Sequence, residues 1–118
     1  MHPEGSRGFP RETRLLSKQD FRRIFDSADC KASHQNVLLL AARNQLNHSR
    51  LGIIVAKKNV RLAVNRNRFK RVTRETFRNL ESREENLDVI VMARRGADKL
   101  DNSTLSSILR QQWQKLLR

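Results

Sequence analysis

The residues best suited to chemistry in this chain are the arginines and lysines of residues 57–78. This segment carries nine basic side chains against one acid, Glu75, so its net charge is +8 in a chain whose formal charge is +13. At about 100° per residue, a helix gathers five polar side chains on one side: Asn67, Lys70, Arg71, Arg74 and Arg78. A guanidinium group can donate two parallel hydrogen bonds to two oxygens of one phosphate. The pattern predicts a face that binds a polyanion, and nucleic acid is the first choice.

The helix has two other possible interpretations. A solvated charged face is the ordinary one, but like charges four residues apart destabilise a helix, so a face of one sign favours a bound polyanion. A basic helix lying on a membrane surface is the second. It is disfavoured because the opposite side of the helix is expected to pack inside a folded domain. That side comprises Phe69, Val72, Thr73, Thr76, Phe77 and Leu80. Glu75 is expected to pair with Arg71 or Arg78.

No set of residues forms a catalytic constellation. Histidines fall in a terminal segment or in predicted loops, two neighbouring glutamates point in different directions, and the single cysteine cannot form an internal disulfide. These residues are His2, His34, His48, Glu84, Glu85 and Cys30. A two-metal nuclease needs several converging acids, and the acids here are dispersed. The sequence therefore predicts no catalytic residue, no metal site and no cofactor bound by the protein itself.

Phe21 and Phe25 are the aromatic candidates. Ser17 can cap a helix, and the Asp20 side chain can accept a hydrogen bond from the backbone N–H of Ser17 in a capping box. In the helix that follows, Phe21, Ile24, Phe25 and Ala28 share one face. By spacing alone, a buried face is the favoured interpretation. The functional alternative is a platform on which single-stranded bases stack.

The remaining elements follow from hydrophobic periodicity. Residues 37–42 and 51–56 are apolar runs separated by turn formers and predict an antiparallel hairpin, and 29–36 predict a loop with a possible short edge strand. The basic helix is expected over 63–83, and the apolar run 87–93 predicts a strand covered on both faces. Residues 101–103 can cap a last helix. Its buried stripe would be Leu105, Ile108, Leu109, Trp113, Leu116 and Leu117.

These elements predict an α+β fold: a small two-layer sandwich with a central, mostly antiparallel sheet of three to four strands and three helices. The expected order is helix, two or three strands, helix, strand, helix. Residues 1–14 are rich in Pro and Gly and predict a flexible arm, and 15–118 predict a single RNA-binding domain. With no apolar run of membrane-spanning length and no secretory signal pattern, the expected location is the cytoplasm.

Residues 56–75, A-K-K-N-V-R-L-A-V-N-R-N-R-F-K-R-V-T-R-E, resemble the signature of the protein subunit of bacterial ribonuclease P. The specific part is Arg66-Asn67-Arg68, then Lys70-Arg71, then Arg74-Glu75. The resemblance extends over nearly all of the chain. This sequence departs from it where many members have a glycine, at Arg61-Leu62, and where many have a tyrosine, at Leu39; it contains no tyrosine.

The resemblance implies an enzyme that removes the 5′ leader from precursor tRNA, in which a large RNA subunit performs the Mg²⁺-dependent hydrolysis. The protein would be the accessory subunit, one per RNA, and not catalytic alone. Contacts to the catalytic RNA would come from Arg61, Arg66, Asn67, Arg68, Lys70, Arg71 and Arg74. Contacts to the single-stranded leader would come from Phe21, Phe25, Lys57, Lys58, Arg94 and Arg95.

The family also implies a left-handed crossover that carries the basic helix between parallel strands, although the general rule favours the opposite hand. It shifts the expectation for Phe21 and Phe25 towards partial exposure. Two other functions remain open on the residues alone. One is a ribosomal protein or general RNA chaperone, and the other is a stand-alone endonuclease, against which the dispersed acids argue.

Overall fold

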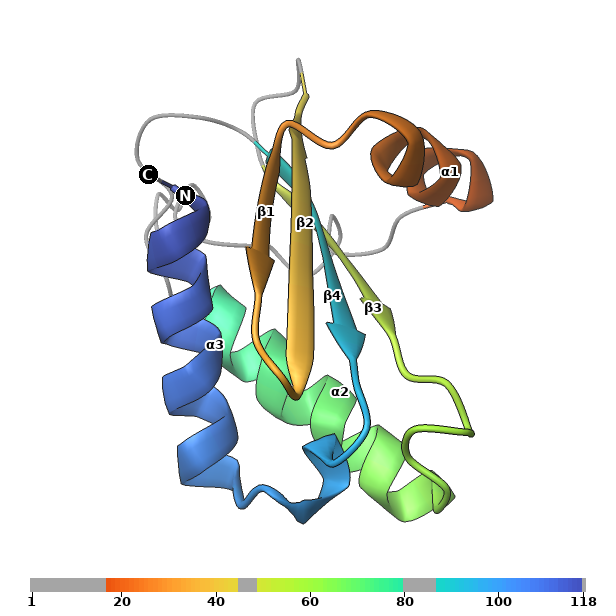
Figure 1. The fold of residues 1–118 in the computed structure, drawn as a ribbon, viewed down its shortest axis with the longest axis vertical. Coiled ribbons are helices and arrows are strands. Elements are labelled where there is room, and N and C mark those ends of the chain that lie inside the picture. The colour runs from red at the N-terminus through yellow and green to blue at the C-terminus, as the bar shows by residue number, and fades with distance from the viewer. Residues whose placement is uncertain (1–16, 45–48, 80–86, 118) are drawn as a thin grey trace, which may run out of the picture.

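A computed structural model describes residues 17–44, 49–79 and 87–117. The predicted α+β class and the predicted order of elements are confirmed (Figure 1). The elements are α1 (Lys18–Ser27), β1 (Cys30–Ser33), β2 (Val37–Arg43), β3 (Arg50–Ile54), α2 (Ala63–Arg78), β4 (Leu87–Ala93), the short 3-10 helix η3 (Ala97–Lys99) and α3 (Asn102–Leu116). The predicted arm, 1–14, lies outside the described residues.

The four strands form one sheet in the order β1-β2-β4-β3. β1 and β2 form an antiparallel hairpin, which confirms the short edge strand and places Cys30 in it. β4 pairs antiparallel with β2 and parallel with β3. The predicted hairpin between the strands now called β2 and β3 is therefore wrong, because β4 lies between them. The apolar run of β4 explains this position, since a central strand is the one covered on both faces and both edges.

The chain passes from β3 through α2 to β4, and these two strands are adjacent and parallel. Figure 1 shows both arrows pointing down, β4 on the left of β3, and α2 behind the sheet. Turned so that the strands point up, the chain moves to the right through a helix on the far side. This is the left-handed crossover that the family resemblance implied.

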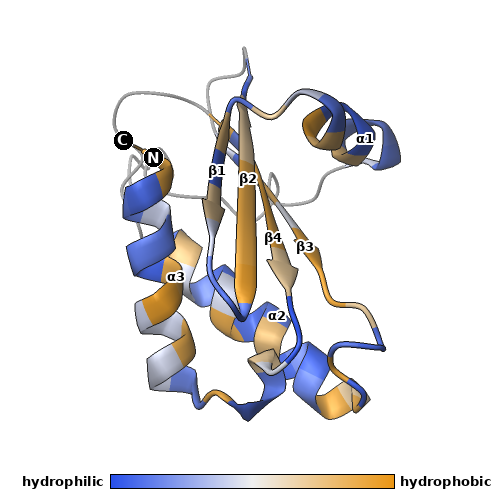
Figure 2. Cartoon of the chain, viewed as in Figure 1, coloured by the Kyte–Doolittle hydropathy of each residue, from blue (hydrophilic) through white to orange (hydrophobic). Residues whose placement is uncertain are grey.

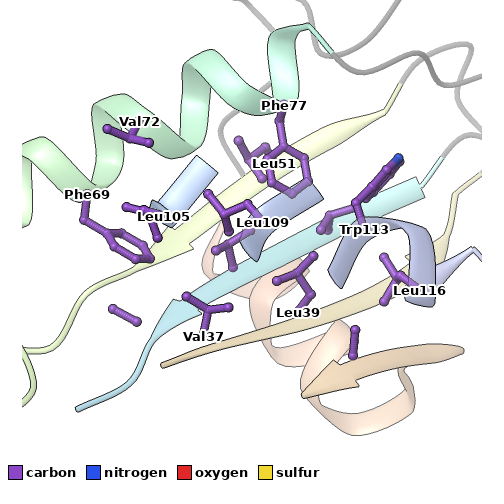
Figure 3. Packing of buried hydrophobic residues seen from close by; sticks show 14 of the residues in the cluster. Val37, Leu39, Leu51, Phe69, Val72, Phe77, Leu105, Leu109, Trp113 and Leu116 are labelled. Atoms are coloured by element: carbon purple, nitrogen blue, oxygen red, sulfur yellow. The ribbon is translucent and has the colours of Figure 1, made fainter. Parts of the chain in front are cut away.

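The main core lies between the sheet and the helices α2 and α3 (Figure 3). The predicted apolar side of α2 is buried from Phe69 to Phe77, while Leu80 lies outside the described residues. Phe77 and Trp113 meet edge to face, with ring centroids 5.4 Å apart. The prediction for α3 fails at Leu117, which is 54% exposed because it follows the last helical residue. α2 ends at Arg78, before the predicted 83.

The other sheet face carries a smaller core under α1. Leu40, Ala42 and Ile90 alternate with the main-core residues along β2 and β4, as a pleated strand requires, and pack with Ile24. α1 covers only the end of the sheet where β4 begins (Figure 1). The buried face of α1 predicted from spacing alone is thus largely wrong: Ile24 is buried and Phe21 half-buried, whereas Phe25 and Ala28 are exposed. The partial exposure of Phe21 and Phe25 that the resemblance implied is confirmed.

Two leucines on or beside α3 test this division of the core. Leu109→Ala removes a fully buried side chain and should lower the free energy of unfolding by about 2–5 kcal/mol. Leu117→Ala, at an exposed position, should change it by less than about 0.5 kcal/mol. Urea unfolding followed by circular dichroism measures both. Equal effects from the two substitutions would contradict the packing described for α3.

Candidate nucleic-acid interface

The helix α2 is fixed to the sheet by one side and presents the other side outwards. Its buried residues recur with helical spacing and lie against the main core. Figure 2 shows hydrophilic residues along α2, in contrast to the apolar strand β2. No acid lies in its first turn and no side chain caps its N-terminus. The exposed N–H groups at that end therefore add to the positive potential of the helix.

The outer side of α2 holds cations without anionic partners. Arg71 and Arg78 are exposed, and Lys70 and Arg74 are partly exposed. Within the described part of the chain, none of these four side chains forms an ion pair. The predicted pairing of Glu75 with Arg71 or Arg78 is also absent there. Exposed ion pairs gain little in water, so the fold loses little stability by leaving these side chains without anionic partners.

Two arginines of the predicted set bend back onto the protein. Arg66 Nη1 donates to the carbonyl oxygens of Val60, at 3.1 Å, and Arg61, at 2.8 Å. Arg68 donates from Nη1 to Asn102 Oδ1, at 2.8 Å, and from Nη2 to the carbonyl of Asp98, at 3.2 Å. These bonds tie α2 to the turn before it and to the start of α3. The acceptors are neutral, so both guanidinium charges remain available to a polyanion. Arg61 and Asn67, also in this set, are exposed.

The structure brings four other predicted residues to one edge of the sheet. Lys57 and Lys58 follow β3 and are exposed, and Arg94 and Arg95 follow β4. The ends of adjacent parallel strands meet at one edge, and Asn59 Nδ2 joins the two segments by donating to the carbonyl of Ala93 at 3.2 Å.

Arg94 is partly committed at this edge. Its Nη1 donates to Ser33 Oγ at 3.0 Å and to the carbonyl of His34 at 2.9 Å. The following Gly96 has φ +89°, and a Cβ there would lie 2.8 Å from Asn36 Nδ2. The same Asn36 nitrogen donates to the carbonyl of Arg95. Glycine is therefore required for this tight packing, which leaves the Arg95 side chain exposed.

Between this edge and α1, the sheet face is half open. Leu38, Met92 and Ile54 stand side by side across β2, β4 and β3, and each is partly buried. Phe21 packs, as they do, against the smaller core under α1, and Phe25 is 46% exposed on the same helix. We call these five residues the open sheet face. An apolar surface next to cations is the combination that binds single-stranded nucleic acid by stacking and charge.

A buried polar cluster, missed by the sequence analysis, holds α1 to this face. Asp88 on β4 is fully buried and accepts two bonds from Arg50, at 2.9 and 2.8 Å, and one from Asn44, at 2.7 Å. Arg23 of α1 also donates to it, and Arg50 reaches Asp20 of α1 at 3.2 Å. Asp20 completes the predicted capping box with Ser17. The signal in the sequence was a lone acid inside an apolar strand.

The cluster keeps both carboxylates ionised. Burial alone would raise the pKa of Asp88, but hydrogen bonds from Arg50, Asn44 and Arg23 outweigh it and hold the pKa below its ordinary value. For Asp20, burial is likewise opposed by hydrogen bonds from Ser17 and by the charge of Arg50, and its pKa is also lowered. Because Ile24 is the one fully buried residue of α1, this cluster is a main attachment of the helix.

Comparison with known proteins identifies the family. The family model described as Ribonuclease P matches residues 9–117. A ribonuclease P protein component from Marinobacter nauticus is 48% identical over 108 residues, covering 92% of this chain and 81% of the relative. One from Pseudomonas aeruginosa is 45% identical over 113 residues, covering 96% and 84%. The chain belongs to the ribonuclease P protein family.

Solved structures of the ribonuclease P protein agree with this assignment. The Staphylococcus aureus protein superposes with a TM-score of 0.79 at 30% identity, covering 89% of this chain and 97% of that one. The Thermotoga maritima protein gives a TM-score of 0.71 at 28% identity, covering 86% and 96%. The function of an RNA-binding subunit of ribonuclease P, inferred from the resemblance, is therefore supported over a ribosomal or chaperone function.

Two kinds of feature are absent from the described ranges, 17–44, 49–79 and 87–117. No three His, Cys, Asp or Glu side chains gather there in a way that could hold a metal ion. No helix there is long and apolar enough to cross a membrane.

Asp88→Asn tests the attachment of α1. It leaves two arginines beside a neutral side chain and should lower the free energy of unfolding by about 3–5 kcal/mol. Asp26→Asn, an exposed position on α1, should cost less than about 0.5 kcal/mol. Urea unfolding measures both.

The acid dependence of stability gives a second test of the same cluster. A carboxylate whose folded pKa is depressed stabilises the fold above its unfolded pKa, and this stability is lost as the pH falls through the folded pKa. Unfolding free energy should therefore be flat from pH 7 to about 5 and fall steeply below about 4. Asp88→Asn should flatten that fall. An unchanged acid slope in the variant would contradict the ionised state of Asp88.

Proposed function

We propose that this protein binds the catalytic RNA of ribonuclease P through the outer side of α2 and the precursor tRNA leader through the open sheet face. Cleavage of the 5′ leader is then carried out by the RNA subunit with its own Mg²⁺. The observation that carries the proposal is the set of uncompensated cations on α2, in a chain that belongs to this family.

The α2 cations supply affinity for the catalytic RNA by displacing counterions from its phosphates. Lys70, Arg71 and Arg74 are directed outwards from a helix whose other side is fixed in the main core. Arg66 and Arg68 hold the N-terminal half of α2 in place while keeping their charge. Protein cations placed among crowded phosphates neutralise charge that Mg²⁺ would otherwise neutralise, so the complex should need less Mg²⁺ than the RNA alone.

The open sheet face suits a leader of variable sequence. Phe25 and Phe21 offer ring surface for bases, and Lys57, Lys58 and Arg95 offer charge for the backbone at the neighbouring sheet edge. Stacking and backbone charge tolerate many sequences, because every base has a flat face and every nucleotide a phosphate. Such contacts fit an enzyme with many precursors. Leu39, where family members often have tyrosine, is buried in the main core and adds no ring to this face.

One reconstitution tests the proposed division of labour. Purified protein, ribonuclease P RNA and precursor tRNA are mixed at low Mg²⁺, with each component omitted in turn. Cleavage that needs both protein and RNA supports the proposal. Cleavage by the protein alone would indicate a stand-alone endonuclease, and no stimulation of the RNA would indicate a general RNA-binding protein. In the proposed complex, one protein serves one RNA in the cytoplasm, and titration of protein against RNA measures that ratio.

Arg71→Gln combined with Arg74→Gln tests the α2 interface. Binding of the ribonuclease P RNA should weaken, and the slope of log affinity against log salt should become shallower by about 2. The control carries the same charge change elsewhere, as Arg22→Gln with Lys115→Gln on α1 and α3. If both pairs change the slope equally, binding depends on net charge and not on the α2 surface.

Phe25→Ala tests the leader site with little risk to the fold, because the ring is nearly half exposed. It should weaken binding of leader-bearing precursor to the complex by about 1–3 kcal/mol per stacked base and leave mature tRNA unaffected. Leu117→Ala is the matched control for loss of an exposed apolar side chain. Equal effects on precursor and mature tRNA, or none on either, would contradict a leader contact at Phe25. The half-buried Phe21 is a poorer probe, since its truncation also removes packing under α1.

A further inference from the structure

A polar groove of about 270 Å³ lies between the second half of α2 and the first half of α3. Figure 1 shows this part of α2 passing behind α3. The groove is slightly smaller than the ~300–1,000 Å³ usual for small-molecule sites, and Val72 is the one apolar residue among those that line it. Its polar residues are Glu75, Thr76, Asn79, Asn102, Ser103, Ser106 and Arg110.

Hydroxyl groups on the groove floor leave a hydrogen-bond donor without an acceptor. Thr76 Oγ1 donates to Ser106 Oγ at 3.1 Å, and Arg110 Nε donates to the same oxygen at 3.4 Å. A hydroxyl oxygen accepts at most two bonds and donates one. Only one of the two hydroxyl protons is used between Thr76 and Ser106, so whichever oxygen donates, one O–H of this pair has no acceptor among the described residues.

Asn102 and Arg110 add further donors. The amide oxygen of Asn102 accepts from Arg68 at 2.8 Å, which directs its NH₂ group away from that bond. Arg110 uses only Nε within the described part of the chain, so its two Nη groups can bind a ligand. Arg68 and Arg110 thus place two guanidinium charges beside a set of neutral donors. The single acid of the groove, Glu75, is exposed.

We propose that this groove binds a segment of RNA sugar–phosphate backbone, extending the interface from α2 onto α3. Arg110 in the lining and Arg68 beside it carry two positive charges against the single negative charge of Glu75, and most of the other polar groups can donate. A phosphodiester supplies both the acceptor oxygens and the negative charge that such a site can bind. Glu75 can accept the 2′-hydroxyl proton of a ribose, the group that distinguishes RNA from DNA. This inference rests on the proposed function and assigns α3 a part in RNA binding.

The test compares single substitutions in binding of full-length protein to ribonuclease P RNA over a range of salt. Arg110→Gln should weaken binding and reduce the salt slope by about 1, as loss of one phosphate contact requires. Ser106→Ala should weaken binding about two- to fivefold without changing the slope, because it removes a neutral hydrogen bond. Lys115→Gln, the same charge change on α3 but outside the groove, should do neither. Thermal unfolding confirms that each variant is folded.

The outcomes separate this inference from the proposed function. If Arg110→Gln behaves like Lys115→Gln while the Arg71/Arg74 pair still flattens the slope, the groove does not bind RNA and the α2 interface stands. If none of these variants has an effect, the proposed function fails as well. If Arg110→Gln abolishes binding of inorganic phosphate but keeps the RNA affinity and the salt slope of the wild type, the groove selects free phosphate, and the assignment to RNA backbone is overturned.

Discussion

The structure depends on a separation of opposite charges: in the described part of the chain, several acidic side chains are bound within the fold, whereas the basic side chains on the outer side of α2 are not. Several acids are used to stabilise the fold: Asp88 and Asp20 hold α1, Asp101 caps α3, and Asp29 accepts the backbone N–H of Arg43. The outward cations of α2 therefore find no carboxylate partner within the described residues. Their mutual repulsion disfavours the isolated protein and is relieved when phosphates approach. Binding of RNA should in turn stabilise the fold, since RNA binds the folded state selectively.

The two sheet faces divide the remaining work. One face carries the main core with α2 and α3, which gives α2 a firm base and fixes the direction of its cations. The other face carries a small core and a polar cluster under α1, and the open sheet face extends beyond them. This asymmetry permits a rigid site for a structured RNA on one side. On the other side it leaves an apolar, partly solvated surface, to which the proposed function assigns the single-stranded leader.

Local patterns predicted the elements well because their causes are local. The capping box of Ser17 and Asp20, the buried side of α2 and the cap of α3 at Asp101 depend on residues within one or two turns. Strand order depends on contacts between residues far apart in sequence. The short connection between 37–42 and 51–56 therefore suggested that these strands pair with each other, whereas β4 lies between them.

The sequence also could not predict which side chains from distant segments bind one another. The family resemblance grouped Arg66 and Arg68 with Arg71 and Arg74, and only the tertiary structure shows that the first two bind the segments beside α2. The acid of the Asp88 cluster stands out in an apolar strand, but its partners come from α1, β3 and the residue after β2. The hydroxyl groups that α2 and α3 share in the groove are likewise distant in sequence.

The most direct test of the account is the reactivity of individual arginines towards a dicarbonyl reagent, measured by mass spectrometry with and without ribonuclease P RNA. In the free protein, Arg71, Arg78 and the exposed Arg22 of α1 should all be modified. Addition of the RNA should protect Arg71 and leave Arg22 reactive. If Arg71 stays as reactive as Arg22 in the complex, the outer side of α2 does not face the RNA, and the account is contradicted.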